Sequence, residues 1–148
     1  MANHVRQQIR ERIATDLTGL TTTASRVYQS RVYPLADNNL PGIIIYTKEE
    51  SSDPVGMGAN REVERTLTVT IQAYCEAVNN IDDTIDTICK EVETALANDK
   101  DLNSLAKDTF LTSTEIMYDA NATQPVGYGS MDFTVIYRTA DNAPDVAL

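Results

Sequence analysis

The chain has 148 residues, 42% of them hydrophobic, which is enough for one packed domain and excludes global disorder. It contains no run of 18 or more apolar residues, so no membrane-spanning helix is expected. The formal net charge is −10, and an acidic surface repels phosphate groups, which argues against general nucleic-acid binding.

The charge is unevenly distributed along the chain. Residues 1–33 hold five arginines against two acidic residues, a net of +3, whereas the remainder holds seven basic against twenty acidic residues, a net of −13. A basic end on an acidic body suits contact between like subunits, although a solvated surface is the default reading. The polar N-terminus lacks the apolar segment of a secretory signal, which predicts a cytosol-like compartment.

The first half of the chain predicts one helix and two strands. Residues 3–20 place apolar side chains at steps of three and four, which is typical of an amphipathic helix. Residues 26–33 are rich in Val and Tyr and are expected to be extended. After a loop of turn-forming residues, GIIIYT at 42–47 predicts a buried strand. The polar stretch 48–60 is predicted to be a long loop.

The second half adds a long strand, a helix and two closing strands. The alternation of REVERTLTVTIQAYCEA, residues 61–77, predicts a strand with one core face and one polar face of threonines, open to solvent or to another chain. Residues 79–98 predict the second helix, FLTSTEIMY and YGSMDFTVIYR predict strands, and residues 139–148 are expected to be a flexible tail.

This order of elements predicts a single domain over residues 1–148. Because each helix has one apolar stripe, both can cover the same face of a sheet. The fold class expected is therefore α+β: an antiparallel sheet with two helices packed on one face, a two-layer sandwich.

No pattern in the chain predicts catalysis, a metal site or a cofactor. Asp99, Asp101 and Asn103 match the first ligand positions of a calcium-binding EF-hand loop, but Ser104 replaces the glycine and Phe110 the closing glutamate. A solvated turn is the better reading. The two cysteines, Cys75 and Cys89, occupy apolar positions and are expected to be buried free thiols.

Arg-Val-Tyr occurs twice, and it places arginine and tyrosine where a core cannot use them. The residues concerned are Arg26, Tyr28, Arg31 and Tyr33. Both residue types are enriched at protein interfaces. Either a bulge near residues 29–30 realigns the two copies, or one side of the strand faces a neighbouring subunit; the sequence leaves both readings open.

Taken together, HxVRQQIRERIATxLTGL, SRVYQSRVYPL, LPGIIIYTKEE, ERTLTVTIQAY, IDDTIDTICKEVETAL and PVGYGSMDFTVIYRT resemble the tail terminator proteins of long-tailed bacteriophages, the lambda-type minor tail protein family. The resemblance spans nearly the whole chain. It implies a structural virion protein, assembled in the bacterial cytoplasm, that forms a hexameric ring without cofactor or catalysis. The ring would bind the head-proximal end of the tail tube, stop its polymerisation and present a surface to the head connector.

The resemblance also lends a role to the predicted loop 48–60. Such loops in ring proteins line a lumen or reach an adjacent ring, so Glu49, Glu50, Asp53 and Arg61 are candidate lumen or interface residues. DNA would only pass through the lumen, and an acidic wall would let it slide. A solvent-facing loop is the plainer alternative. For the whole chain, the alternatives are another neck or head-completion protein, or a small cytosolic ligand-binding domain with a concave pocket.

Overall fold

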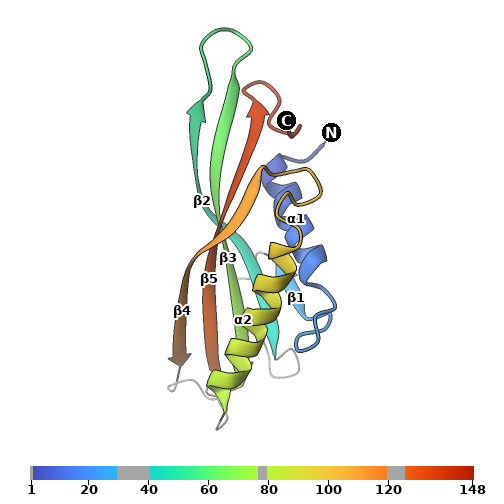
Figure 1. Ribbon diagram of the computed structural model, residues 1–148, viewed down its shortest axis with the longest axis vertical. Coiled ribbons are helices and arrows are strands. Elements are labelled where there is room, and N and C mark those ends of the chain that lie inside the picture. The colour runs from blue at the N-terminus through green and yellow to red at the C-terminus, as the bar shows by residue number, and fades with distance from the viewer. Residues whose placement is uncertain (1, 30–40, 77–79, 120–125) are drawn as a thin grey trace.

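The structure is a computed structural model that describes residues 2–29, 41–76, 80–119 and 126–148 (Figure 1). Its helices and strands follow the predicted order. They are α1 (Val5–Leu17), β1 (Val27–Gln29), β2 (Gly42–Pro54), β3 (Glu62–Glu76), α2 (Ile81–Ala97), β4 (Asp108–Asp119) and β5 (Val126–Ala140). The α+β class predicted from the sequence is confirmed.

The five strands form one sheet in the order β1-β2-β3-β5-β4. Three of the four neighbouring pairs are antiparallel, but β1 pairs with β2 in parallel, so the prediction of a wholly antiparallel sheet is wrong at this edge. A parallel pair needs a connection of about a dozen residues, and the stretch between Gln29 and Gly42 supplies one of that length.

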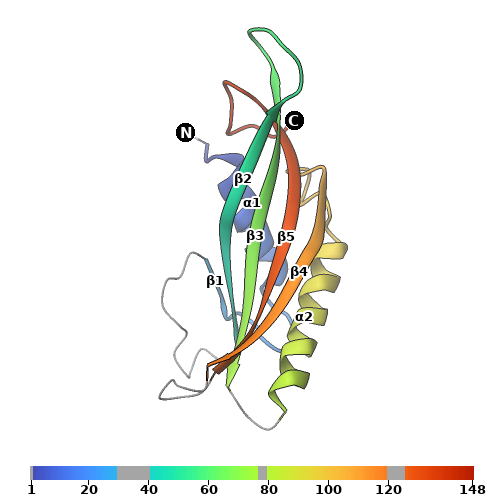
Figure 2. The same cartoon turned by 90° about the vertical axis from the view of Figure 1, so that its left-hand side faces the viewer.

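Both helices cover the same face of the sheet, which makes the two layers expected (Figure 2). On α1 the predicted stripe is buried: Val5, Ile9, Ile13 and Leu17 have no exposed surface. Strand β5 alternates between buried and half-buried residues along its whole length, as a strand with one covered face must. The core that results joins both helices to β2, β3 and β5.

Helix α2 approaches β5 where that strand carries glycine. A Cβ atom on Gly129 would lie 2.9 Å from Cγ2 of Ile85 and 3.2 Å from Sγ of Cys89. On Gly127 it would lie 2.4 Å from Cδ1 of Ile81. The missing side chains therefore let the first turns of α2 lie close against the sheet.

Strand β2 continues through residues that the sequence predicted to be loop. Residues 48–54 pair with β3 as far as Pro54, and the connection is limited to residues 55–61. The polar composition misled the prediction because this part of the strand extends beyond the helices, where few apolar side chains are needed. In Figure 1 the β2–β3 hairpin projects past the rest of the molecule.

A bulge at Lys48 shifts the register of β2 against β3. Before it Thr47 lies opposite Val69, and after it Glu49 lies opposite Thr68. Because faces alternate along a strand, the extra residue moves Glu50 to the helix-covered face, opposite Leu67.

The C-terminal residues, expected to form a flexible tail, are joined to both layers in the structure. Thr139 and Ala140 belong to β5. The carbonyl of Pro144 accepts a hydrogen bond from the first helical amide, Val5 N, at 2.9 Å, and Leu148 N donates to Arg138 O at 2.9 Å.

Candidate assembly surfaces

One face of the sheet is left uncovered by the helices, and we call it the open face. It consists of the side chains of β3 and β5 that alternate with the core, together with their neighbours on β2 and β4. Figure 2 shows this side of the sheet turned toward the viewer. Its middle is rich in hydroxyl groups, as the outward threonines of the sequence predicted. They include Thr66, Thr68, Thr70, Ser130 and Thr134.

Asp132 is the centre of a polar network on the open face. It accepts hydrogen bonds from Thr70 Oγ1 at 2.7 Å and Ser113 Oγ at 3.5 Å, and Lys48 Nζ lies 3.6 Å away. The partners come from β3, β4 and the bulge of β2. These cross-strand bonds restrain the polar side chains, which favours a well-ordered surface for contact.

An aromatic cluster lies at the end of the open face nearest the start of α2. The rings of Tyr74 and Tyr128 stack with centroids 4.9 Å apart and an interplanar angle of 25°. Tyr74 donates to Gln72 Oε1 at 2.9 Å, and Gln72 Nε2 donates to Tyr46 at 3.2 Å. Partial burial raises the pKa of Tyr74, so it stays a neutral donor at neutral pH.

A buried ionic cluster lies on the opposite, helix-covered face at the start of α1. Glu50 Oε2 is 2.7 Å from Arg6 Nη1 and 3.4 Å from Arg65 Nη1, and its other oxygen accepts a hydrogen bond from Tyr137. The Glu50 side chain is 9% exposed. Burial, then the bond to Glu50, raises the pKa of Tyr137. Glu50 was predicted to be a loop residue at a lumen or interface. The structure places it in β2, where the bulge turns its side chain to the helix-covered face and against Arg6, Arg65 and Tyr137.

A second charged cluster joins α1 to the connection after α2. Arg12 Nε lies 2.9 Å from Asp99 Oδ2 and 3.4 Å from Asp16 Oδ1. Burial, followed by the hydrogen bond and charge of Asp99, raises the pKa of Asp16 to about 7, while the same hydrogen bond lowers the pKa of Asp99. The two carboxyl groups therefore hold one proton between them at mildly acid pH.

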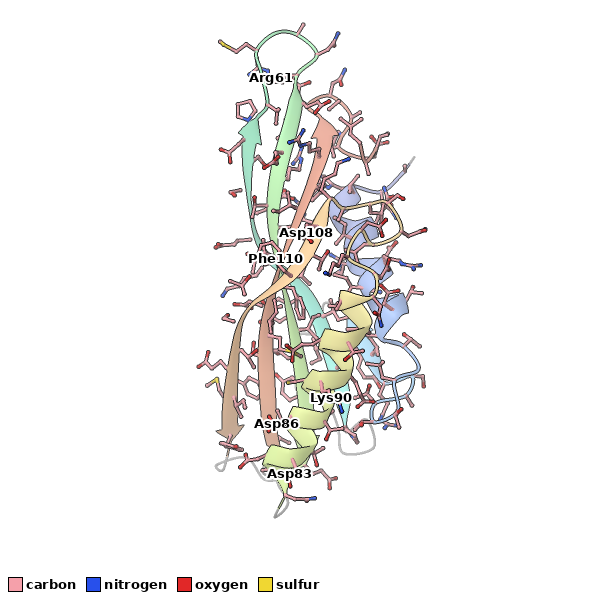
Figure 3. All side chains as sticks on the ribbon, in the orientation of Figure 1. Arg61, Asp83, Asp86, Lys90, Asp108 and Phe110 are labelled. Carbon is pink, nitrogen blue, oxygen red and sulfur yellow. The ribbon has the colours of Figure 1, made fainter. Side chains whose placement is uncertain are left out.

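The three other residues assigned to the predicted loop lie along the projecting hairpin. Glu49 and Asp53 are exposed and lie on the open-face side of β2, opposite Thr68 and Glu64. Arg61 follows the tip, donates to Gly58 O at 3.3 Å, and lies 3.7 Å from Asp141 (Figure 3). Nothing brings these three residues into one site.

At the tip of the hairpin the chain exposes apolar surface. Met57 is 98% exposed, and it stands between two glycines, Gly56 and Gly58, whose φ angles are +128° and +121°. Those conformations favour glycine and make a tight turn that points the methionine outward.

The Arg-Val-Tyr residues are described only in part. Arg26 is engaged within the chain, because Nε donates to Pro41 O at 2.7 Å and Nη2 to Thr22 O at 3.1 Å. These two hydrogen bonds fix the position of the Arg26 side chain. Tyr28 is half-buried on β1. Arg31, Tyr33 and the predicted bulge near residues 29–30 lie wholly or partly outside the described residues.

Reactive groups in the described chain are few. Cys75 and Cys89 are free and buried, as predicted, and burial raises the pKa of each thiol to about 11, so both stay protonated at neutral pH. No group of three or more His, Cys, Asp or Glu side chains within the described residues is arranged to hold a metal ion. Among those residues no helix is long and apolar enough to cross a membrane.

Comparison with known proteins identifies the protein family of this chain. A family model described as phage minor tail protein U matches residues 4–137. The chain belongs to this family, and is thus a structural protein of phage tails. One chain of a solved structure titled "Virion of native gene transfer agent (GTA) particle" is 12% identical, with 90% of this chain and 92% of that chain covered. Its TM-score of 0.35 is too low to support further argument. No curated protein matches the chain.

Proposed function

We propose that this protein is a tail terminator: a ring that binds the head-proximal end of the finished tail tube, stops its polymerisation and offers a surface for joining the head. The family match over residues 4–137 is the observation that carries the proposal, because it concerns the whole fold rather than one motif. The protein acts by contact, without catalysis or a cofactor.

The arrangement of surfaces supports an assembly role. The open face carries a bonded network of hydroxyl and carboxylate groups, and the hairpin extends an exposed methionine beyond it. A polar surface and a projecting arm suit stacking of one ring on another. In this role the partners are further copies of the chain, the major tail tube protein and the head connector.

DNA would pass through the ring without being bound. The chain has a net charge of −10, so on balance it repels a phosphate backbone. Exposed carboxylates such as Glu49 and Asp53 would repel DNA if they lined the passage.

The test is the length of tail tubes assembled from purified tube protein of the same phage, with and without this chain, measured by electron microscopy. We expect tubes that stop growing and carry a ring at one end when the chain is present. Tubes that elongate equally in both samples would contradict the proposal. If the chain instead binds the purified head connector and leaves tubes unchanged, it is another neck protein.

The hairpin offers a sharper variant of that test. Met57→Lys changes a side chain that is 98% exposed, so folding should be unaffected. If the arm contacts the tube, this variant caps tubes less well than the parent. Val146→Lys, at an exposed apolar residue near the C-terminus, serves as the matched control.

A further inference from the structure

Strand β4 is an open edge of the sheet. It is last in the strand order, and within the described residues it pairs with one strand, β5, so the main-chain groups of its other side have no strand partner. Proteins usually protect such edges with short strands, lysine or proline. The twelve residues of β4 contain neither lysine nor proline, and the strand is regular after the register shift between Leu111 and Ser113.

The same strand exposes apolar side chains on both faces. Half of the eight exposed large hydrophobic residues in the described chain lie on β4: Phe110, Ile116, Met117 and Tyr118, at 42–54% exposure. By register Phe110 and Met117 belong to the open face, and the other two to the helix side. An edge with free main-chain groups and apolar side chains on both faces is suited to a protein partner.

Charge differs between the two edges of the sheet. Residues 80–119, which form α2, β4 and their connection, hold ten acidic side chains against three lysines, a net of −7. Residues 2–29, which form α1 and β1, hold four arginines against two acidic side chains, a net of +2. Two of those acids lie against the N-terminal segment, because Asp99 pairs with Arg12 and Glu91 accepts hydrogen bonds from Thr22. At the β4 edge the acidic charge is that of β4 itself, which holds three acidic residues and no basic one, and of the first turns of α2 (Figure 3 labels Asp83 and Asp86). β1 and β4 are the outermost strands, so Arg10, which donates to Gln29 of β1, lies at the opposite edge.

We propose that the β4 edge of one copy binds the α1–β1 edge of a second copy of this chain. Pairing of β4 with another β4 would bring two acidic edges together, whereas contact with α1 and β1 joins opposite charges. An interface between two different surfaces repeats from copy to copy, and it closes into a ring when the rotation allows. The inference rests on the proposed ring, and it names the surfaces that build it.

The first test changes the edge without changing the core. Ile116→Lys places a charge on β4 at a side chain that is 42% exposed, and a lysine stem can cover the same surface. We expect light scattering to show a multimer for the parent and a 16.3 kDa monomer for this variant, with an unchanged thermal midpoint. Met57→Lys, the same change at the hairpin tip, should keep the multimer.

The second test distinguishes the two ways in which edges can meet. Thr114 on β4 and Gln29 on β1 are exposed, and the native thiols are buried, so cysteines introduced at these positions can be cross-linked selectively by a bis-maleimide. For the double variant Thr114→Cys/Gln29→Cys we expect a series of cross-linked oligomers, the largest of which contains as many copies as the ring. The single variant Thr114→Cys should give no linked dimer.

The outcomes separate this inference from the proposed function. A multimer that survives Ile116→Lys, a linked dimer of the Thr114→Cys variant, or a parent that stays monomeric at every concentration would overturn the edge contact. A chain that fails these tests yet caps tubes remains a terminator with another interface. If the chain passes these tests but leaves tube length unchanged, the edge interface is supported and the terminator function is contradicted.

Discussion

The two helices that cover the sheet are attached by different means. Helix α1 has charged clusters near both of its ends: Arg6 reaches Glu50 on β2, and Arg12 reaches Asp99 after α2. Helix α2 lies instead over glycines of β5, which bring Ile85 close to the strand. Both helices also bury an apolar stripe.

Because of this difference, the packing of α1 and the packing of α2 should respond to different perturbations. Ionic clusters respond to the loss of one charge, to salt and to pH, because an unpaired buried charge is costly. A close approach of backbone to side chain responds to added volume and is indifferent to salt. Four substitutions separate the two modes, and we give them from the largest expected effect to the smallest.

Glu50→Ala should lower the free energy of unfolding by about 3 kcal/mol, because it leaves Arg65 charged and mostly buried and removes the acceptor of Tyr137. Urea unfolding at pH 7 measures the loss. Glu49→Ala, one residue earlier but exposed, is the control and should change stability by less than about 0.5 kcal/mol. Equal losses in the two variants would show that the cluster does not hold α1.

Gly129→Ala should lower the free energy of unfolding by about 2 kcal/mol, since its Cβ would lie 2.9 Å from Cγ2 of Ile85. Calorimetry at low and high salt should give the same loss. Ile85→Leu removes the obstructing methyl branch, so in that background the alanine should cost less. A loss that is unchanged by this second substitution would assign the effect to the backbone rather than to α2.

Asp16→Asn should change how stability depends on pH. The folded pKa of about 7 lies above the ordinary value of 3.8, so between pH 5 and pH 7 the folded chain holds a proton that the unfolded chain has lost. Stability therefore falls as pH rises through this window, by about 1 kcal/mol after allowance for solvent screening. The variant should abolish that fall in unfolding curves, and Asp101→Asn, at an exposed neighbour, should retain it.

Arg6→Gln should cost about 1 kcal/mol and Arg10→Gln less than about 0.5 kcal/mol. Both arginines belong to α1, but Arg6 contacts a buried carboxylate at 2.7 Å, whereas Arg10 donates to the exposed amide of Gln29 at 3.2 Å. Paired denaturation curves compare the two. The reverse order would mean that the basic edge, not the buried cluster, stabilises the helix.

Regular elements of the molecule could be predicted from the sequence because their periodicity is local. The helix expected at residues 3–20 is found at Val5–Leu17, and the one expected at 79–98 is found at Ile81–Ala97. The long strand expected at 61–77 is Glu62–Glu76. In each case the side chains of the predicted apolar face are largely buried, since that face is what drives packing.

Features that depend on distant partners were not predictable. The burial of Glu50 depends on its ion pairs with Arg6 and Arg65, which are distant from it in the chain. No local sequence pattern predicts these contacts. The parallel pairing of β1 likewise depends on where the chain returns rather than on the composition of the strand. The alternating threonines of β3 predicted the open face, but they did not predict the hydrogen bond from Thr70 to Asp132.

Lys48 acts as an insertion that changes the phase of everything after it in β2. Upstream, odd-numbered residues such as Ile45 face the helices; downstream, even-numbered residues such as Glu50 do. Loss of this one codon would leave a regular ladder, in which the pair Thr47–Val69 is followed directly by Glu49–Thr68 and Glu50–Leu67, so Glu49 would stay outward and Glu50 inward. The bulge therefore absorbs one extra residue of β2 without changing which side chains of the arm are buried and which are displayed.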